Sequence, residues 1–118
     1  MPVYKTLRYR IRPEARLDAE RAMHEFATYV RGELPGSAWT MYRDPHDPAY
    51  YLAILRAEDR AADARHGEAP GTRAFAAAIA PFLLEAEGEI RELELVTSSD
   101  LARRHRPDHR PGAGRRPR

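Results

Sequence analysis

The sequence of residues 37–57 is SAWTMYRDPHDPAYYLAILRA, and this stretch decides the fold. Residues 37–43 alternate, with Trp39 and Met41 on one face, which predicts a strand. Residues 49–56 are rich in Tyr and Ile and predict the next strand. Between the two, DPHDP predicts a turn, because prolines fix φ and aspartates can bond the backbone ahead. The stretch therefore predicts an antiparallel hairpin.

Helices are predicted on both sides of this hairpin. The preceding helix starts between Glu14 and Asp18 and stops before Pro35. The following helix is expected in two pieces, residues 58–66 and a piece capped by Thr72, separated by a glycine-containing break. The first helix should bury an apolar stripe made of Ala15, Ala19, Ala22, Met23, Phe26, Ala27 and Val30. Its charged side should face solvent and includes Arg16, Glu20, Arg21, Glu25 and Arg31.

The outermost segments complete the pattern. Val3–Ile11 alternates with period two, and Ile90–Thr97 is predicted as the last strand. The order strand, helix, strand, strand, helix, strand is typical of a ferredoxin-like α+β fold. We therefore expect a four-stranded antiparallel sheet with both helices on one face.

The face of the sheet without helices is expected to be apolar. It would carry Tyr4, Thr6, Trp39, Met41 and at least one of Tyr50 and Tyr51; alternation leaves open which parity of each strand faces outward, but apolar groups stand at both. Because a face of this kind is unfavourable in water, a homodimer with two-fold symmetry is predicted. The alternative is a monomer with an exposed aromatic face.

The composition of the 118 residues limits the chemistry. The chain has no Cys, which excludes disulfides, thiolate nucleophiles and Cys-based zinc sites, and it also lacks Asn and Gln. No apolar run approaches the roughly 20 residues of a membrane span, and no signal-peptide pattern is present, so we expect a cytoplasmic protein.

Charge divides the chain into a domain, residues 1–97, and a basic tail, residues 98–118. Residues 103–118 hold seven Arg and one Asp, which leaves a net charge of −4 on residues 1–102. The tail is predicted to be a disordered, solvated terminus, with contact to nucleic acid or anionic lipid as the alternative. The acidic domain argues against nucleic-acid binding.

An ordered set of motifs resembles the antibiotic-biosynthesis-monooxygenase domain family of the dimeric α+β barrel superfamily. The motifs are Tyr-Arg-Ile-Arg-Pro-Glu at 9–14, Glu-Leu-Pro-Gly at 33–36, Asp-Pro-Ala-Tyr-Tyr at 47–51, His66 with Pro70, Arg-Ala-Phe at 73–75 and Ile-Ala-Pro-Phe-Leu at 79–83. The resemblance implies a dimeric barrel with a ligand pocket between sheet and helices in each subunit.

Several members of that family oxygenate quinols or anthrones without flavin, haem or metal. The resemblance thus implies a cofactor-independent monooxygenase, using O2 and a polycyclic phenol, quinol or anthrone-like, polyketide-type substrate. The haem-degrading members use an Asn, which this chain lacks, and the family's Glu and Trp on the third strand are replaced in residues 54–57. An isomerase or cyclase using the same pocket and a non-catalytic dimer that binds small molecules remain alternatives.

Two residues are predicted to be catalytic. His66 precedes the break in the second helix, where it could serve as a base, or alternatively contact the free carbonyls of the helix end. Arg73 could hold an anionic oxygen, or alternatively face solvent.

Four aromatic residues are predicted to bind substrate, with core packing or an interface as the alternative roles: Tyr9, Trp39, Tyr42 and Tyr50. No metal site and no cofactor are expected. Only His46, with Asp44 and Asp47 in the same turn, offers a weak surface possibility for a metal ion.

Overall fold

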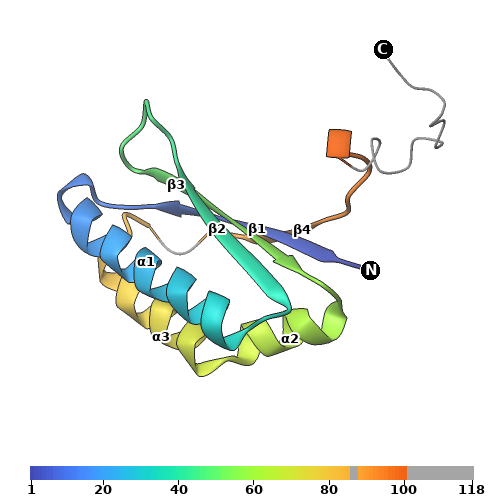
Figure 1. Ribbon diagram of the computed structural model, residues 1–118. Helices are drawn as coiled ribbons and strands as arrows, with labels where there is room; N and C mark the ends of the chain where they lie inside the picture. Colours follow the sequence, from blue (N-terminus) through green and yellow to red (C-terminus); the bar gives the residue numbers. More distant parts are fainter. Residues whose placement is uncertain (86–87, 101–118) are drawn as a thin grey trace, which may run out of the picture.

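The computed structural model describes residues 1–85 and 88–100, and it contains one antiparallel sheet covered on one face by helices (Figure 1). The strands lie in the order β2-β3-β1-β4. This arrangement confirms the predicted ferredoxin-like α+β fold. The elements are β1 (Val3–Arg10), the 3-10 turn η1 (Pro13–Ala15), α1 (Arg16–Glu33), β2 (Ser37–Arg43), β3 (Tyr50–Ala57), α2 (Arg60–Glu68), α3 (Pro70–Ile79), the 3-10 turn η2 (Ala80–Phe82) and β4 (Ile90–Leu93).

The core lies between the sheet and the pair of helices α1 and α3, which run side by side in Figure 1. Phe26 of α1 stacks on Phe75 of α3, with ring centroids 4.6 Å apart. Tyr9 and Tyr51 contribute buried rings from the sheet. The apolar stripe predicted for the first helix is therefore the surface that joins α1 to both the sheet and α3.

Strand register assigns each side chain to one face of the sheet. Leu7 of β1 is paired with Ala53 of β3 and Ile90 of β4, so these three lie on the helix-covered face. Trp39 pairs with Leu55 and Met41 with Ala53, which places both on the same covered face. Trp39 and Met41 were assigned to the face without helices while the outward parity of each strand was left open, and the register places them on the other face. Since β2 carries aromatic groups at both parities, alternation alone did not identify its inner face.

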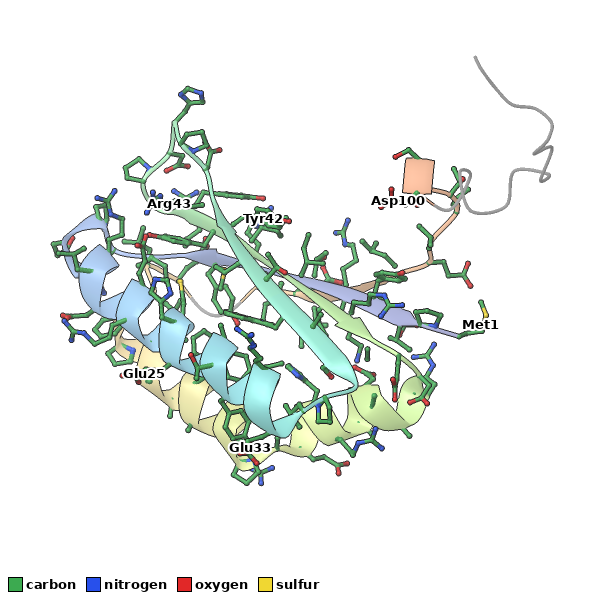
Figure 2. The ribbon with its side chains drawn as sticks, viewed as in Figure 1. Met1, Glu25, Glu33, Tyr42, Arg43 and Asp100 are labelled. Atoms are coloured by element: carbon green, nitrogen blue, oxygen red, sulfur yellow. The ribbon has the colours of Figure 1, made fainter. Side chains whose placement is uncertain are left out.

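The open face of the sheet mixes apolar and cationic side chains. Tyr50 faces this side and Tyr51 the core, since paired residues share a face and Tyr51 is buried. Tyr42 is also on the open face and is 56% exposed (Figure 2). The face further carries Tyr4, Thr6, Arg8, Leu52, Ile54, Arg56, Arg91 and Leu93.

The second helix is divided at Ala69, between α2 and α3. Asp59 caps α2, its side chain accepting the backbone N–H of Ala62 at 2.8 Å. Thr72 does not cap α3, which begins at Pro70; its hydroxyl instead donates to the carbonyl of His66 at 2.6 Å. That bond ties the end of α2 to the first turn of α3.

A close helix contact also fixes the position of α3. A side chain at Gly71 would overlap the ring of Tyr29 on α1, so only glycine allows this approach. The junction between α2 and α3 is thus held against α1.

The last strand is shorter than predicted, ending at Leu93 instead of Thr97. Leu93 pairs with Tyr4, and β1 begins only one residue earlier, at Val3, so β1 offers little backbone for further pairing. Most of the predicted tail, residues 101–118, lies outside the described residues. Among those that are described, no helix is both long and apolar enough to cross a membrane.

Candidate functional site

A cavity of about 320 Å³ lies between the covered face of the sheet and helices α2 and α3; we call it the inner cavity. Four of the six predicted site residues line it: His66, Arg73, Tyr9 and Trp39. The remaining walls come mainly from Lys5, Leu7, Phe26, Ala53, Leu55, Asp63, Thr72, Phe75 and Ala76. The cavity is therefore aromatic and aliphatic, with a few charged groups.

His66 is the buried polar residue of this wall. Only 7% of it is exposed, and its ring meets Phe26 edge-to-face at 5.7 Å. The Nδ1 atom is buried and has no hydrogen-bond partner among the described residues. Its own carbonyl is already bonded by Thr72, whereas the ring nitrogen is not used to bond the helix end. A buried nitrogen without a partner is unusual, and it distinguishes His66 from the other residues of the cavity wall.

Burial is the main influence on the pKa of His66. Burial lowers the pKa of His66 below its ordinary value; the Asp63 carboxylate acts in the opposite direction, and Lys5 acts with burial. Lys5 and Asp63 form an ion pair of 2.8 Å, so the carboxylate is largely compensated. A neutral imidazole in this place can accept a proton.

Sequence analysis did not identify Lys5 and Asp63 as site residues, although signals for both were present. Lys5 shares the parity of Val3 and Leu7, so it is a charged residue on an apolar strand face. Asp63 precedes His66 by three residues and thus shares its helix face.

Arg73 lies on α3 at the edge of the inner cavity and is exposed. No carboxylate of the described residues forms an ion pair with it. Its guanidinium is therefore free to meet an anionic oxygen at the cavity mouth.

Aromatic rings form one side of the inner cavity. Trp39 meets Phe26 edge-to-face at 4.8 Å and Phe75 at 5.5 Å, and Tyr9 meets Phe75 at 6.3 Å. Such a wall suits a planar aromatic ligand.

Tyr42 and Tyr50, the other two predicted substrate-binding residues, do not line this cavity. Both project from the open face, where Tyr50 borders a shallow depression of about 190 Å³ with Arg8 and Leu52. The strand parity that brings Tyr51 into the core necessarily turns Tyr50 outward.

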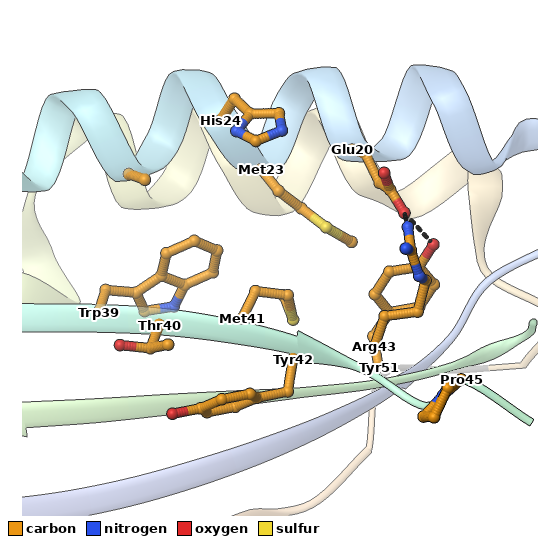
Figure 3. Close-up of a pocket in the computed structure, with 11 residues that line it drawn as sticks. Glu20, Met23, His24, Trp39, Thr40, Met41, Tyr42, Arg43, Pro45 and Tyr51 are labelled. Atoms are coloured by element: carbon orange, nitrogen blue, oxygen red, sulfur yellow. Dashed lines mark hydrogen bonds and ion pairs between the residues drawn. The ribbon is translucent and has the colours of Figure 1, made fainter.

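A second depression of about 540 Å³ opens between α1 and β2; we call it the outer hollow (Figure 3). At one end, Tyr51 donates a hydrogen bond of 2.6 Å to Glu20, and Arg43 donates one of 2.7 Å to the same carboxylate oxygen. Trp39, Met23 and Met41 line its apolar part.

Three polar groups at one end of the outer hollow, Glu20, Tyr51 and Arg43, bond one another. Burial acts to raise the pKa of Glu20, but the bonds from Tyr51 and Arg43 outweigh it, and the pKa is lowered. Burial and then the Glu20 bond raise the pKa of Tyr51 to about 12, so the phenol stays protonated. The cluster ties α1 to β2 and β3. Sequence analysis had placed Glu20 on the solvent side, because a helical pattern does not reveal a partner on a distant strand.

Known proteins resemble this chain in structure and not in sequence. No family model and no curated protein sequence matches the chain. Solved structures do match: Rv0793 from Mycobacterium tuberculosis has a TM-score of 0.72 at 20% identity, covering 84% of this chain and 99% of its own. A Caulobacter crescentus protein provisionally named as an antibiotic biosynthesis monooxygenase has a TM-score of 0.75 at 20% identity, with 81% and 91% coverage.

A variant of SnoaB from Streptomyces nogalater, named a cofactor-independent oxygenase, has a TM-score of 0.71 at 20% identity, with 83% and 96% coverage. The chain has the antibiotic-biosynthesis-monooxygenase fold. The predicted resemblance is thereby confirmed for the fold of this chain. In this antibiotic-biosynthesis-monooxygenase fold, the inner cavity occupies the predicted position between sheet and helices.

The turn between β2 and β3 uses its polar groups for its own structure. Asp44 accepts the backbone N–H of His46 at 2.7 Å, and Asp47 accepts that of Ala49 at 3.1 Å while lying 3.4 Å from Arg10. Across the described part of this monooxygenase-like fold, no three His, Asp or Glu side chains are grouped as a metal site would require.

Proposed function

We propose that this protein is a cofactor-independent monooxygenase that oxidises an aromatic phenol, quinol or anthrone-like substrate in the inner cavity. One observation carries the proposal: His66 is buried on the wall of an aromatic cavity with its Nδ1 unpartnered among the described residues. The cofactor-independent oxygenase SnoaB, which shares the fold, supports it.

The chemistry follows from the environment of His66. A neutral imidazole accepts the acidic proton of the bound substrate, whose anion is electron-rich enough to reduce O2. With an anthrone, the methylene carbon becomes a carbonyl: one oxygen atom enters the quinone product and the other leaves as water with two substrate hydrogens. The protein supplies the base and the binding site, while the substrate supplies the electrons.

One of the remaining groups stabilises the anion. Arg73 brings a positive charge to the cavity mouth, whereas the Lys5 ammonium on β1 is paired with the Asp63 carboxylate. In such a low-dielectric site a fixed charge acts more strongly on a developing anion than it does in water.

The functional unit in this proposal is a homodimer formed through the open face. Leu52 and Ile54 stand at the centre of that face, between Tyr4 and Tyr42 on the neighbouring strands. Light scattering at micromolar concentration should give twice the chain mass, and Ile54→Asp should shift it to one chain. A monomeric wild type would contradict the dimer.

The decisive experiment is oxygen consumption with an anthrone or a naphthoquinol in the absence of added cofactor. The proposal predicts quinone formation with one O2 consumed per anthrone. Ligand binding without oxygen consumption would contradict it and would indicate an isomerase, a cyclase or a non-catalytic binding protein.

A further inference from the structure

Trp39 stands between the inner cavity and the outer hollow. It lines the inner cavity of about 320 Å³ and also the outer hollow of about 540 Å³, and it is the one residue of the described chain that lines both. Figure 3 shows its indole extending from β2 toward α1, beside Met41.

The side chain is held in this position by two aromatic contacts. Phe26 and Phe75, at 4.8 Å and 5.5 Å, meet its ring edge-to-face from the inner cavity. Met23 and Met41 line the opposite, outer side. Trp39 is thus fixed by rings on the side where a ligand would bind, and by flexible thioethers on the side that opens to solvent.

We propose that Trp39 is a partition that sets the upper size of the ligand, and that the outer hollow would receive the additional rings of a larger ligand if Trp39 were absent. This inference rests on the proposed function, because it assumes that an aromatic ligand occupies the inner cavity. The inner cavity is at the small end of the range for ligand sites, roughly 300–1,000 Å³. The inner cavity therefore suits a compact aromatic ligand, and Trp39 limits how far that ligand can extend toward the outer hollow.

The substitution Trp39→Leu tests the partition, because leucine keeps an apolar side chain and removes the indole. The probes are 1-naphthol, with two rings, and 1-hydroxypyrene, with four, and calorimetry gives their affinities. Wild type should bind 1-naphthol and exclude 1-hydroxypyrene. Relative to wild type, Trp39→Leu should shift the ratio of the two affinities toward 1-hydroxypyrene by at least about tenfold.

Two further variants make the result specific. Met41→Ala enlarges the outer hollow alone, because Met41 does not line the inner cavity. This variant should keep the wild-type preference for 1-naphthol over 1-hydroxypyrene. Trp39→Phe retains aromatic packing and should give a smaller gain for 1-hydroxypyrene, so the test survives if Trp39→Leu fails to fold.

The outcomes separate the two claims. If wild type binds 1-naphthol but neither Trp39 variant gains affinity for 1-hydroxypyrene, the partition is wrong and the proposed function stands. The partition would also be overturned if Met41→Ala gained as much affinity for 1-hydroxypyrene as Trp39→Leu does. If neither wild type nor any of the variants binds 1-naphthol or 1-hydroxypyrene, both the proposed function and the partition are wrong.

Discussion

The inner cavity and the outer hollow lie on opposite sides of Trp39, and they differ in whether their buried polar groups have hydrogen-bond partners. In the outer hollow, Tyr51 and Arg43 both bond the Glu20 carboxylate. In the inner cavity, the buried Nδ1 of His66 has no partner in the described part of the chain. A satisfied cluster strengthens the fold, whereas an unsatisfied buried group costs about 1–3 kcal/mol unless a ligand or a water molecule bonds it. We therefore expect substitutions in the Glu20 cluster to affect stability and substitutions at His66 to affect the proposed activity.

The largest expected effect is on catalysis, at the unsatisfied site. His66→Ala removes the proposed base and should lower the rate of anthrone oxidation by roughly 10²–10⁴. His24→Ala is the matched control, because His24 is exposed on α1 and should leave the rate unchanged. Rates are measured with an oxygen electrode, and circular dichroism confirms that both variants fold. Full activity in His66→Ala would show that His66 is not the base of the reaction.

The next effect is on stability, at the satisfied site. Tyr51→Phe removes the hydroxyl bond to a charged carboxylate and should reduce the free energy of unfolding by about 1.5–3 kcal/mol, while substrate turnover is retained. Tyr29→Phe, on α1, removes a hydroxyl that has no bond in the described residues and should change stability by less than about 0.5 kcal/mol. Urea denaturation measures both. Equal losses would show that the Glu20 cluster does not stabilise the fold.

Acidification should destabilise the protein through the inner cavity. Because the pKa of His66 is lower in the folded state, the unfolded chain takes up its proton first as the pH falls below about 6.5. Stability is therefore lost as the pH falls from about 6.5 to the folded-state pKa, and this contribution is constant above that window. His66→Leu should show a flatter dependence of melting temperature on pH over the same range, and identical profiles would contradict this role for His66.

The smallest effect concerns the Lys5–Asp63 pair. Lys5→Met removes a positive charge and exposes His66 to an uncompensated carboxylate, so the pKa of His66 should rise. Asp63→Asn should lower it. Titration of the His66 ring signals by NMR distinguishes the two directions, and a shift of the same sign in both variants would show that this pair does not act electrostatically on His66.

Periodicity predicted the fold well, because each element has a regular apolar spacing. It also placed Val3, Leu7 and Tyr9 on one face of β1, and these do face the helices. It did not assign the inner face of β2, where aromatic groups stand at both parities.

For the candidate site, the helix break led to His66, while Lys5, Asp63 and Glu20 were missed. Lys5 and Glu20 bond partners on distant elements, which sequence spacing does not encode, whereas Asp63 could have been found from its three-residue spacing to His66. The same limit explains Tyr42 and Tyr50, which were predicted as site residues from their chemistry alone but face the other side of the sheet.

The most direct test of the proposed site is the pair of ¹⁵N NMR signals of the His66 ring in histidine-labelled protein, recorded without oxygen before and after addition of 1-naphthol. If an aromatic hydroxyl binds beside His66 in the inner cavity, these ring-nitrogen signals should shift with saturation while the signals of exposed His24 stay in place. Binding of 1-naphthol that leaves the His66 signal unchanged would contradict the account.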